Sequence, residues 1–287
     1  MQFTKATRKK AKLRLALSGP SGSGKTYSAL LLAKGIGART AVIDTERDSA
    51  SLYSDIMEFD SLNLSAPYSP ERYIQAIRAA EQAGYETLVI DSLSHEWSGV
   101  GGCLELVDEI AKAKFRGNSW SAWNEVTPRH RALLDAILQS PMHIIATTRA
   151  KTETAQTEEN GRKKVVKLGM KAEQRDGLEY EFTIALDLVH DGNYATASKD
   201  RTGLFSRRDP QPVTEETGRE LLAWLDSGAS APDVRAIIEN IAKSATSDVL
   251  RTNYEAAMQM LPEEHHAEVR AAKNRRYREL VPKEEAT

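Results

Sequence analysis

The chain has 287 residues, of which 40% are hydrophobic and 28% charged, and its formal net charge is −2. This composition is typical of a soluble globular protein and excludes collagen, low-complexity disorder and a membrane bundle. The length predicts about two domains. The single cysteine, Cys103, excludes an intramolecular disulfide, and without paired Cys/His spacing a structural zinc site is not expected.

Basic residues are concentrated in three stretches, residues 1–14, 162–175 and 270–278. Such clusters either meet a polyanion or form solvated faces that acids elsewhere balance. The first stretch has no apolar segment followed by small residues, so it does not resemble a secretory signal. We therefore expect a cytoplasmic protein with no membrane partner.

The first half of the chain alternates between strand and helix patterns. Short apolar runs predict strands at residues 13–17, 40–44, 87–91 and 142–147. Helices are predicted at 26–34, ended by Gly35 and Gly37, from Ser69-Pro70-Glu71 to Gly84, and from Thr127-Pro128 through Leu138. This alternation predicts an α/β fold with a mainly parallel sheet and helices on both faces.

The pattern changes after residue 180. Two strands, 182–189 and 194–198, flank Asp191-Gly192-Asn193 and predict an antiparallel hairpin. A helix at 215–226, a linker at 227–231 and two or three helices over 232–280 follow. We expect a basic tail at 1–12, a nucleotide-binding core at 13–226 and a C-terminal helical module at 232–287.

A phosphate-binding loop follows the first predicted strand. Its residues match G-x-x-x-x-G-K-[ST] and are Gly19, Pro20, Ser21, Gly22, Ser23, Gly24, Lys25 and Thr26, with Tyr27 next. The glycines let backbone N–H groups surround phosphates, and the following helix adds its positive end. Lys25 can reach the β and γ phosphates, and Thr26 can supply a hydroxyl to Mg²⁺. The loop predicts ATP and Mg²⁺ as cofactors.

Acidic residues lie at the ends of two other predicted strands. Asp91 ends the strand at 87–91, where a carboxylate can hold Mg²⁺ through water. Hydrolysis also needs a group that orients water. Glu46, just after the strand at 40–44, is our preferred candidate and Glu96 the competitor. The alternative is that each only caps or pairs at the sheet edge.

The sequence resembles the RecA-type recombinase ATPases, most of all the short, core-only proteins of bacteriophages. The resemblance rests on G-P-S-G-S-G-K-T, I-D-T-E at 43–46, V-I-D-S at 89–92, D-S-L-S-H-E-W at 91–97, V-T-P-R-H at 126–130 and Q-R-D-G-L-E-Y-E-F at 174–182. It covers residues 11–210 and implies a RecA-like core, in the host cytoplasm if the chain is phage-encoded. It favours Glu46 as the group that activates water.

The family also uses two cations on a late strand to reach the neighbouring subunit's nucleotide. Lys199-Asp200-Arg201 fits that pattern, so Lys199 and Arg201 are candidate trans-acting residues, the alternative being a basic strand end. One departure concerns the fourth strand, which ends in Thr147-Thr148-Arg149 rather than in an Asn-Gln-like sensor. We expect Arg149 to sense phosphate instead, and the coupling of hydrolysis to DNA binding is left open.

Two segments are candidates for binding single-stranded DNA. The first, 112–123, interleaves basic and aromatic residues, and its candidates are Lys112, Lys114, Arg116 and Trp120. Trp120 and Trp123 have an alternative role in a helix core. The second, 151–175, has the length of a functional loop, and its candidates are Arg162, Lys163, Lys164, Lys167, Lys171 and Arg175. In order along the chain these match the family's two DNA-contacting loops.

The leading hypothesis is an ATP-binding, ATP-hydrolysing protein that assembles on single-stranded DNA and promotes annealing or homologous recombination. Its partners would be single-stranded DNA, further copies of itself in a ring or filament, and a single-strand DNA-binding protein. One alternative is a nucleotide or small-molecule kinase, with 151–175 as its lid. Another is a non-catalytic scaffold or loader in which ATP only switches assembly.

Overall fold

The computed structural model describes residues 8–159, 162–229, 232–261 and 263–281. The chain divides into two compact units. One comprises residues 11–227, and the other comprises residues 1–10 together with 228–287. The larger unit carries the sheet and every element discussed below until the C-terminal helices.

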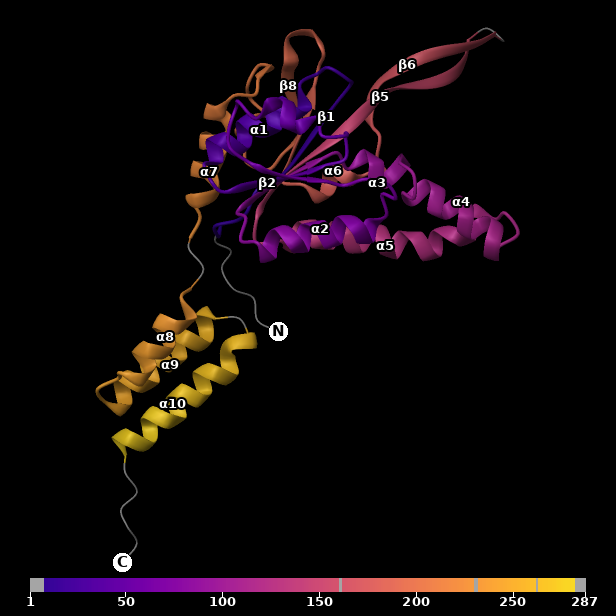
Figure 1. The fold of residues 1–287 in the computed structure, drawn as a ribbon. Helices are drawn as coiled ribbons and strands as arrows, with labels where there is room; N and C mark the ends of the chain where they lie inside the picture. Colours follow the sequence, from indigo (N-terminus) through magenta and orange to yellow (C-terminus); the bar gives the residue numbers. More distant parts are fainter. Residues whose placement is uncertain (1–7, 160–161, 230–231, 262, 282–287) are drawn as a thin grey trace, which may run out of the picture. The chain divides into compact units, whose positions relative to one another are not determined.

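A twisted sheet organises the larger unit (Figure 1). The strand order is β3-β2-β4-β5-β1-β7-β8-β9, and β6 pairs only with β5. The strands are β1 (Arg14–Gly19), β2 (Thr40–Asp44), β3 (Asp60–Asn63), β4 (Thr87–Asp91), β5 (His143–Glu159), β6 (Arg162–Ala172), β7 (Ile184–Leu188), β8 (Tyr194–Asp200) and β9 (Gln211–Pro212). The strands from β3 to β7 in this order are parallel, and β6, β8 and β9 pair antiparallel. The predicted α/β class is confirmed.

Helices cover both faces of this sheet, as the alternating pattern predicts. α1 (Lys25–Ile36) and α7 (Glu215–Asp226) pack on one face, and α2 (Pro70–Gln82) and α5 (Ser119–Gln139) pack on the other (Figure 1). Each face has its own buried hydrophobic cluster. The central strands are buried on both sides, which is why they consist of nearly continuous apolar runs.

The first helix extends further than predicted. Gly35, expected to end it, lies inside α1, and the helix ends at Gly37 in the left-handed conformation, with φ 72°. A Cβ on Gly35 would lie 2.0 Å from the carbonyl oxygen of Glu215 and 2.8 Å from the Cα of Gly218. Gly35 therefore lets α1 and α7 approach closely and does not stop the helix.

The helix predicted to begin at Thr127-Pro128 begins earlier. α5 starts at Ser119, where the Asn118 side chain accepts a hydrogen bond from the Ser121 amide, and Pro128 lies in its interior. α3 (Ser94–Ser98) and α4 (Cys103–Lys114) precede it, and α4 packs along α5 around its own buried cluster. The segment 112–123 is therefore not a loop. It comprises the end of α4, a short turn and the start of α5.

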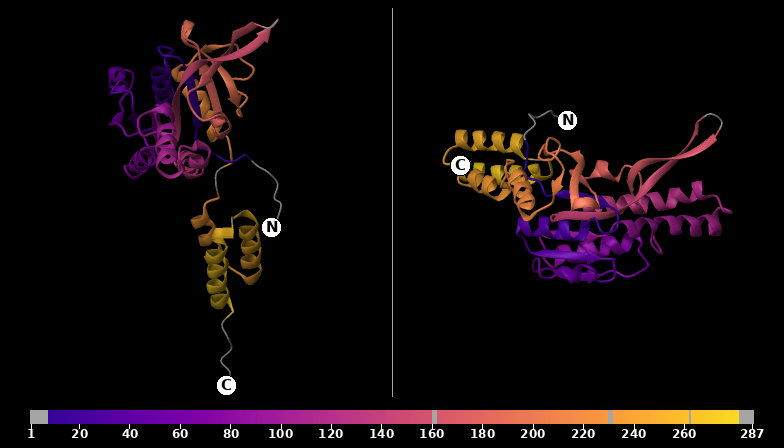
Figure 2. Two further views of the ribbon diagram at one scale, coloured as in Figure 1. Left: turned by 90° about the vertical axis from the view of Figure 1, so that its right-hand side faces the viewer. Right: turned by 90° about the horizontal axis from the view of Figure 1, so that it is seen from above.

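The predicted long loop at 151–175 is mostly a β-hairpin. β5 pairs with β1 up to Arg149 and then, from Ala150, with β6 in antiparallel register. Figure 2 shows this hairpin projecting beyond the sheet. One continuous strand thus passes from the centre of the core into the hairpin. The short helix α6 (Leu178–Glu181) follows and leads into β7.

The remaining predictions agree with the structure more closely. β7 and β8 form the predicted antiparallel pair, with η2 (Asp191–Asn193) between them, and α7 has its predicted bounds. One more short turn of 3-10 helix, η1 (Ala50–Tyr53), follows β2. No helix among the described residues combines the length and the apolar character needed to cross a membrane.

The second unit is helical in its described part. α8 (Val234–Ala242), α9 (Ser247–Met260) and α10 (His266–Leu280) pack around a small buried cluster, with η3 (Glu263–His265) before α10. Residues Ile241, Leu250 and Val269 are at its centre. Most of the predicted tail, residues 1–7, lies outside the described residues.

Candidate functional site

The phosphate loop lies where the central strand β1 passes into α1. Gly22 and Gly24 have φ of 76° and 79°, a left-handed conformation that favours glycine. Lys25 and Thr26 begin α1, so the positive end of the helix points toward the loop. A cavity of about 680 Å³ opens at this point, lined on the loop side by Ser21, Gly22, Gly24, Lys25 and Thr26. Its size and its donors suit a nucleotide.

Three oxygen-bearing side chains converge at the tip of β4. The Thr26 hydroxyl donates to Asp91 Oδ2 at 2.5 Å, and the Thr147 hydroxyl donates to Asp91 Oδ1. Asp91 is 2% exposed, and burial raises the pKa of its carboxyl. Mg²⁺ prefers oxygen ligands and favours the charged carboxylate, so this donor set fits the ion well. Thr26 and Asp91 would hold it, as the sequence predicts.

Lys25 is held inside the loop. Its ammonium group donates to the carbonyl oxygen of Pro20 at 2.9 Å. Burial lowers the pKa of Lys25, while the carboxylates of Asp91 and Glu46 oppose that shift. The Lys25 ammonium group therefore lies at the cavity wall, where a phosphate oxygen can replace the Pro20 carbonyl oxygen as its hydrogen-bond partner.

Glu46 faces the cavity from the end of β2, and Arg149 holds it there. The Arg149 side chain donates to both carboxylate oxygens, at 3.0 Å for Nε to Oε1, and the Ser92 hydroxyl donates to Oε1 at 3.1 Å. Burial alone would raise the pKa of Glu46, but the hydrogen bond and charge of Arg149, together with His95 and the Ser92 hydroxyl, outweigh it, so the pKa is lowered. Neighbouring Asp44 is structural, since its carboxylate accepts from the amides of Glu46 and Ala50.

Glu96, the competing candidate, does not reach the cavity. It is fully buried under α3, where its carboxylate accepts hydrogen bonds from Cys103, His130 and Gln174. The turn of α3 directs Glu96 inward toward α4 and α5. The structure therefore brings Glu46 and not Glu96 to the phosphate loop, which corrects the catalytic assignment of Glu96.

Aromatic and polar residues complete the wall of the cavity, and the sequence patterns did not single them out. Tyr53 lines the cavity and packs edge-on against Tyr27, at 6.0 Å between ring centroids. Tyr27, predicted to bind the cofactor, supports Tyr53 from α1. His95 also lines the cavity, with Nδ1 2.8 Å from the Thr45 hydroxyl, and burial lowers its pKa. Tyr53 gave no sequence signal because η1 is too short for a periodic pattern.

The two predicted trans-acting cations lie away from this cavity. Lys199 donates to the carbonyl oxygens of Glu179 and Tyr180, and Arg201 donates to the carbonyl oxygen of Tyr180 at 3.4 Å. Asp200 between them accepts amide hydrogen bonds from the following turn, so its role is structural. Neither cation has a carboxylate partner within the described part of the chain.

The predicted DNA-binding residues lie in two regions, around the α4–α5 turn and along β6, with Arg175 just after β6, where its guanidinium lies 5.8 Å from the Trp123 ring centroid. Lys112, Lys114, Arg116 and Trp120 surround the turn between α4 and α5, where Lys114 pairs with Glu125 and Trp120 is 84% exposed. Lys171 ends the hairpin beside Asp176, at 2.8 Å. The backbone of Arg162, Lys163, Lys164 and Lys167 belongs to β6, and their side chains lie outside the described residues.

The base of the β5–β6 hairpin contributes two residues to the wall of the cavity. Lys151 and Glu173 form an ion pair across the first residues of the hairpin, and both line the cavity. The amide of Glu173 also donates to the carbonyl oxygen of Arg149 at 2.6 Å. The base of the hairpin and the residue that holds Glu46 are therefore one connected structure.

A comparison with protein families identifies the core. A family model described as AAA domain matches residues 11–216, which include the phosphate loop, β4 and the hairpin. None of the curated proteins matches the chain. The matched region and the loop–helix cradle around Lys25 agree, and the chain belongs to the AAA domain family of P-loop ATPases.

Proposed function

We propose that the chain is a phage-type RecA-like ATPase that assembles on single-stranded DNA and promotes annealing or homologous recombination. ATP and Mg²⁺ occupy the cavity between the phosphate loop and Asp91. The observation that carries this proposal is the path of β5, which runs from the wall of the ATP cavity directly into a basic hairpin.

The hairpin has the charge and reach for a polyanion. Residues 150–172 contain six basic and three acidic side chains, and the basic ones gather on β6. Its strands project from the sheet (Figure 2), so a strand of DNA can lie along them without entering the core. Contacts of this kind are electrostatic, so the affinity should fall steeply with salt.

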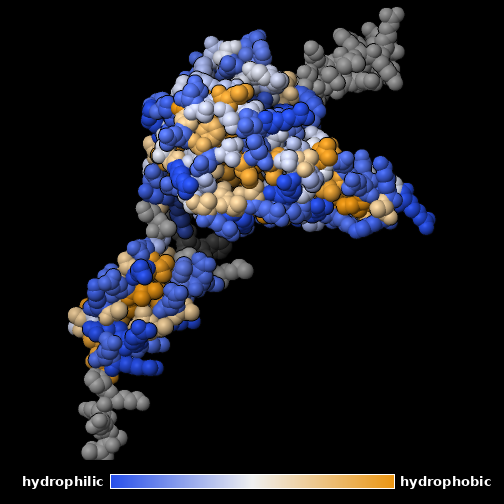
Figure 3. Space-filling view, viewed as in Figure 1, coloured by the Kyte–Doolittle hydropathy of each residue, from blue (hydrophilic) through white to orange (hydrophobic). Residues whose placement is uncertain are grey.

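The turn between α4 and α5 supplies the second contact. Trp120 is exposed beside the basic residues Lys112 and Arg116, and exposed aromatic rings are the usual stacking platforms for unpaired bases. Figure 3 shows further hydrophobic side chains at the surface away from this turn, toward the start of α4, where Leu104 is 41% exposed. A mixed apolar and cationic surface suits single strands better than duplex DNA, whose bases are stacked inside.

Assembly of further copies completes the ATP site. Lys199 and Arg201 lie at and just after the end of β8, outside their own cavity. Among the described residues neither has a carboxylate partner: both donate to carbonyl oxygens, and Lys199 also lies 5.8 Å from the centroid of the Tyr180 ring. A neighbouring subunit's triphosphate would give them the charge partner that they lack. The resulting ring or filament would place successive hairpins along one DNA strand.

The experiment that tests the function compares ATP turnover with and without single-stranded DNA, alongside sizing of the protein with a non-hydrolysable ATP analogue. The proposal predicts turnover that DNA stimulates and assembly that needs both nucleotide and DNA. Phosphate transfer to a small acceptor would instead identify a kinase. Nucleotide binding and assembly without turnover would identify a scaffold, and the ATPase part of the proposal would be wrong.

The Arg149–Glu46 pair predicts a shift in pH dependence. In the parent, Arg149 holds the pKa of Glu46 below its ordinary value, so Glu46 stays ionised well into the acidic range. Arg149→Ala leaves burial as the main influence, and the pKa rises. The acidic limb of the kcat profile should therefore move to higher pH, with a smaller shift for Arg149→Lys. A uniform loss of rate with an unmoved limb would show that Arg149 acts on phosphate instead.

A further inference from the structure

A second cavity lies between α5 and α6, and its lining shares no residue with the ATP cavity. Its volume is about 310 Å³, at the lower end of the range for ligand pockets. It opens where the chain leaves the hairpin, because Arg175 and Asp176 line it just after β6. Any group bound here would lie at the root of the proposed DNA-binding hairpin.

A buried histidine faces this cavity with one nitrogen unused. The His130 side chain is 2% exposed, and its Nδ1 lies 3.0 Å from Glu96 Oε1. Because a carboxylate only accepts, Nδ1 carries a proton and the ring is fixed in orientation. Nε2 is buried and, within the part of the chain that the structure describes, has no hydrogen-bond partner. Buried polar atoms are nearly always paired, so an unpaired one at a cavity wall indicates a missing ligand.

His130 belongs to a buried cluster whose other polar groups hydrogen-bond to one another. Glu96 Oε1 also accepts from the Cys103 thiol at 3.0 Å, and Gln174 donates to Oε2 at 3.1 Å. Burial raises the pKa of Cys103, so the thiol stays protonated. These contacts satisfy every member of the group except His130 Nε2, which is the atom left for a ligand.

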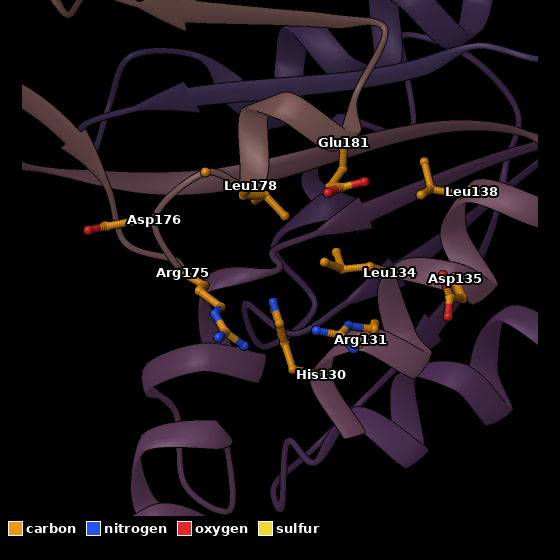
Figure 4. A pocket seen from close by; sticks show the side chains of 10 residues that line it. His130, Arg131, Leu134, Asp135, Leu138, Arg175, Asp176, Leu178 and Glu181 are labelled. Atoms are coloured by element: carbon orange, nitrogen blue, oxygen red, sulfur yellow. The ribbon is translucent and has the colours of Figure 1, made fainter. Parts of the chain in front are cut away.

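Two arginines flank that nitrogen. Figure 4 shows the His130 ring between the side chains of Arg131 and Arg175, with Leu134 and Leu178 further into the cavity. Within the described residues, Arg131 has no hydrogen bond or ion pair. The planar guanidinium groups can donate hydrogen bonds and stack on flat rings.

An aromatic path connects the cavity to the surface. The Arg175 guanidinium lies 5.8 Å from the Trp123 ring centroid, Trp123 stacks on Trp97 at 5.5 Å, and the Trp97 ring meets His130 edge-on at 5.6 Å. Trp120 lies one turn before Trp123 on α5 and is exposed. Stacked aromatic rings therefore reach from Trp123 to His130 at the cavity, and Trp120 offers an exposed ring one helical turn away.

The lining discriminates between the parts of a nucleotide. Asp135 and Glu181 line the same cavity as the arginines, so a phosphate would meet repulsion as well as attraction. A base suits this mixed lining better, because its flat ring can stack on a guanidinium group and its edge carries both hydrogen-bond donors and acceptors. We propose that this cavity binds one base that is splayed out of the bound single strand. This proposal rests on the proposed function and assigns one of the contacts that hold the DNA.

The test uses the full chain and two labelled strands of equal length, an oligothymidine and an oligonucleotide whose sugars carry no bases. The parent should bind the oligothymidine more tightly. Arg131→Ala should weaken oligothymidine binding about tenfold, leave the base-free strand unaffected and leave the salt dependence unchanged. His130→Gln should act in the same direction. Arg78→Ala, an exposed arginine on α2, serves as the control, and ATP binding reports that each variant is folded.

Each other outcome overturns a different part. Equal weakening of both strands with a smaller salt dependence would show that Arg131 contacts phosphate and that no base enters. Variants that bind oligothymidine like the parent would remove the cavity from the DNA site while the proposed function stands. A parent that binds neither strand would overturn the proposed function and this site together.

Discussion

Glu46→Gln is expected to stop ATP turnover while ATP remains bound. Glutamine keeps the size of the side chain and an oxygen for Arg149, but it cannot take a proton from the attacking water. Positioned general bases contribute between about 100-fold and 10,000-fold, so the fall in kcat should lie in that range. Steady-state phosphate release and fluorescent-nucleotide binding measure the two properties separately.

The same cavity provides a matched control. Glu173 also lines it, but its carboxylate is engaged by Lys151 and by the Ser98 hydroxyl, at 3.0 Å for the latter. Glu173→Gln should therefore change turnover little. If Glu173→Gln abolished turnover and Glu46→Gln did not, the water would be activated from the hairpin root, and the assignment of Glu46 would be wrong.

Two inactive variants are expected to restore each other's activity when they are mixed. Lys25→Ala removes the grip on phosphate but keeps Lys199 and Arg201, whereas the double variant Lys199→Ala, Arg201→Ala keeps the loop and loses the trans-acting cations. Each alone should lose about 1,000-fold in turnover, the scale expected for a cation that acts on the transferring phosphate. An equal mixture should recover about a quarter of the parent rate. Each head-to-tail junction needs an intact phosphate loop from one subunit and intact cations from its neighbour, and random assembly combines the two in about a quarter of the junctions.

The control for this mixture is Arg207→Ala, which removes an exposed cation from the turn after β8. It should be active alone and need no partner. The opposite result would be a mixture that recovers no ATP turnover although each inactive variant still joins assemblies of the parent. That result would show that Lys199 and Arg201 only connect β8 to α6. The DNA-dependent assembly would then have to complete its ATP site by other residues.

Local sequence was sufficient wherever one element carried its own signal. The buried strands consist of apolar runs that fit no other environment, and the phosphate loop needs its glycines for backbone geometry, so both were predictable without any partner. Element boundaries that depend on a neighbour were not. Gly35 looks like a helix stop until α7 is packed against it, and Pro128 looks like a helix start although it lies within α5.

Long-range packing decided the composition of the site. The sequence by itself determined that Lys25, Thr26 and Asp91 would meet, because parallel strands bring their carboxyl ends to one edge. It favoured Glu46 over Glu96 but left Glu96 as a competitor, since both follow buried strands closely. Only the tertiary structure placed Glu96 beside His130 in the core and Glu46 against Arg149, because burial and pairing depend on partners that lie 34 and 103 positions away along the chain.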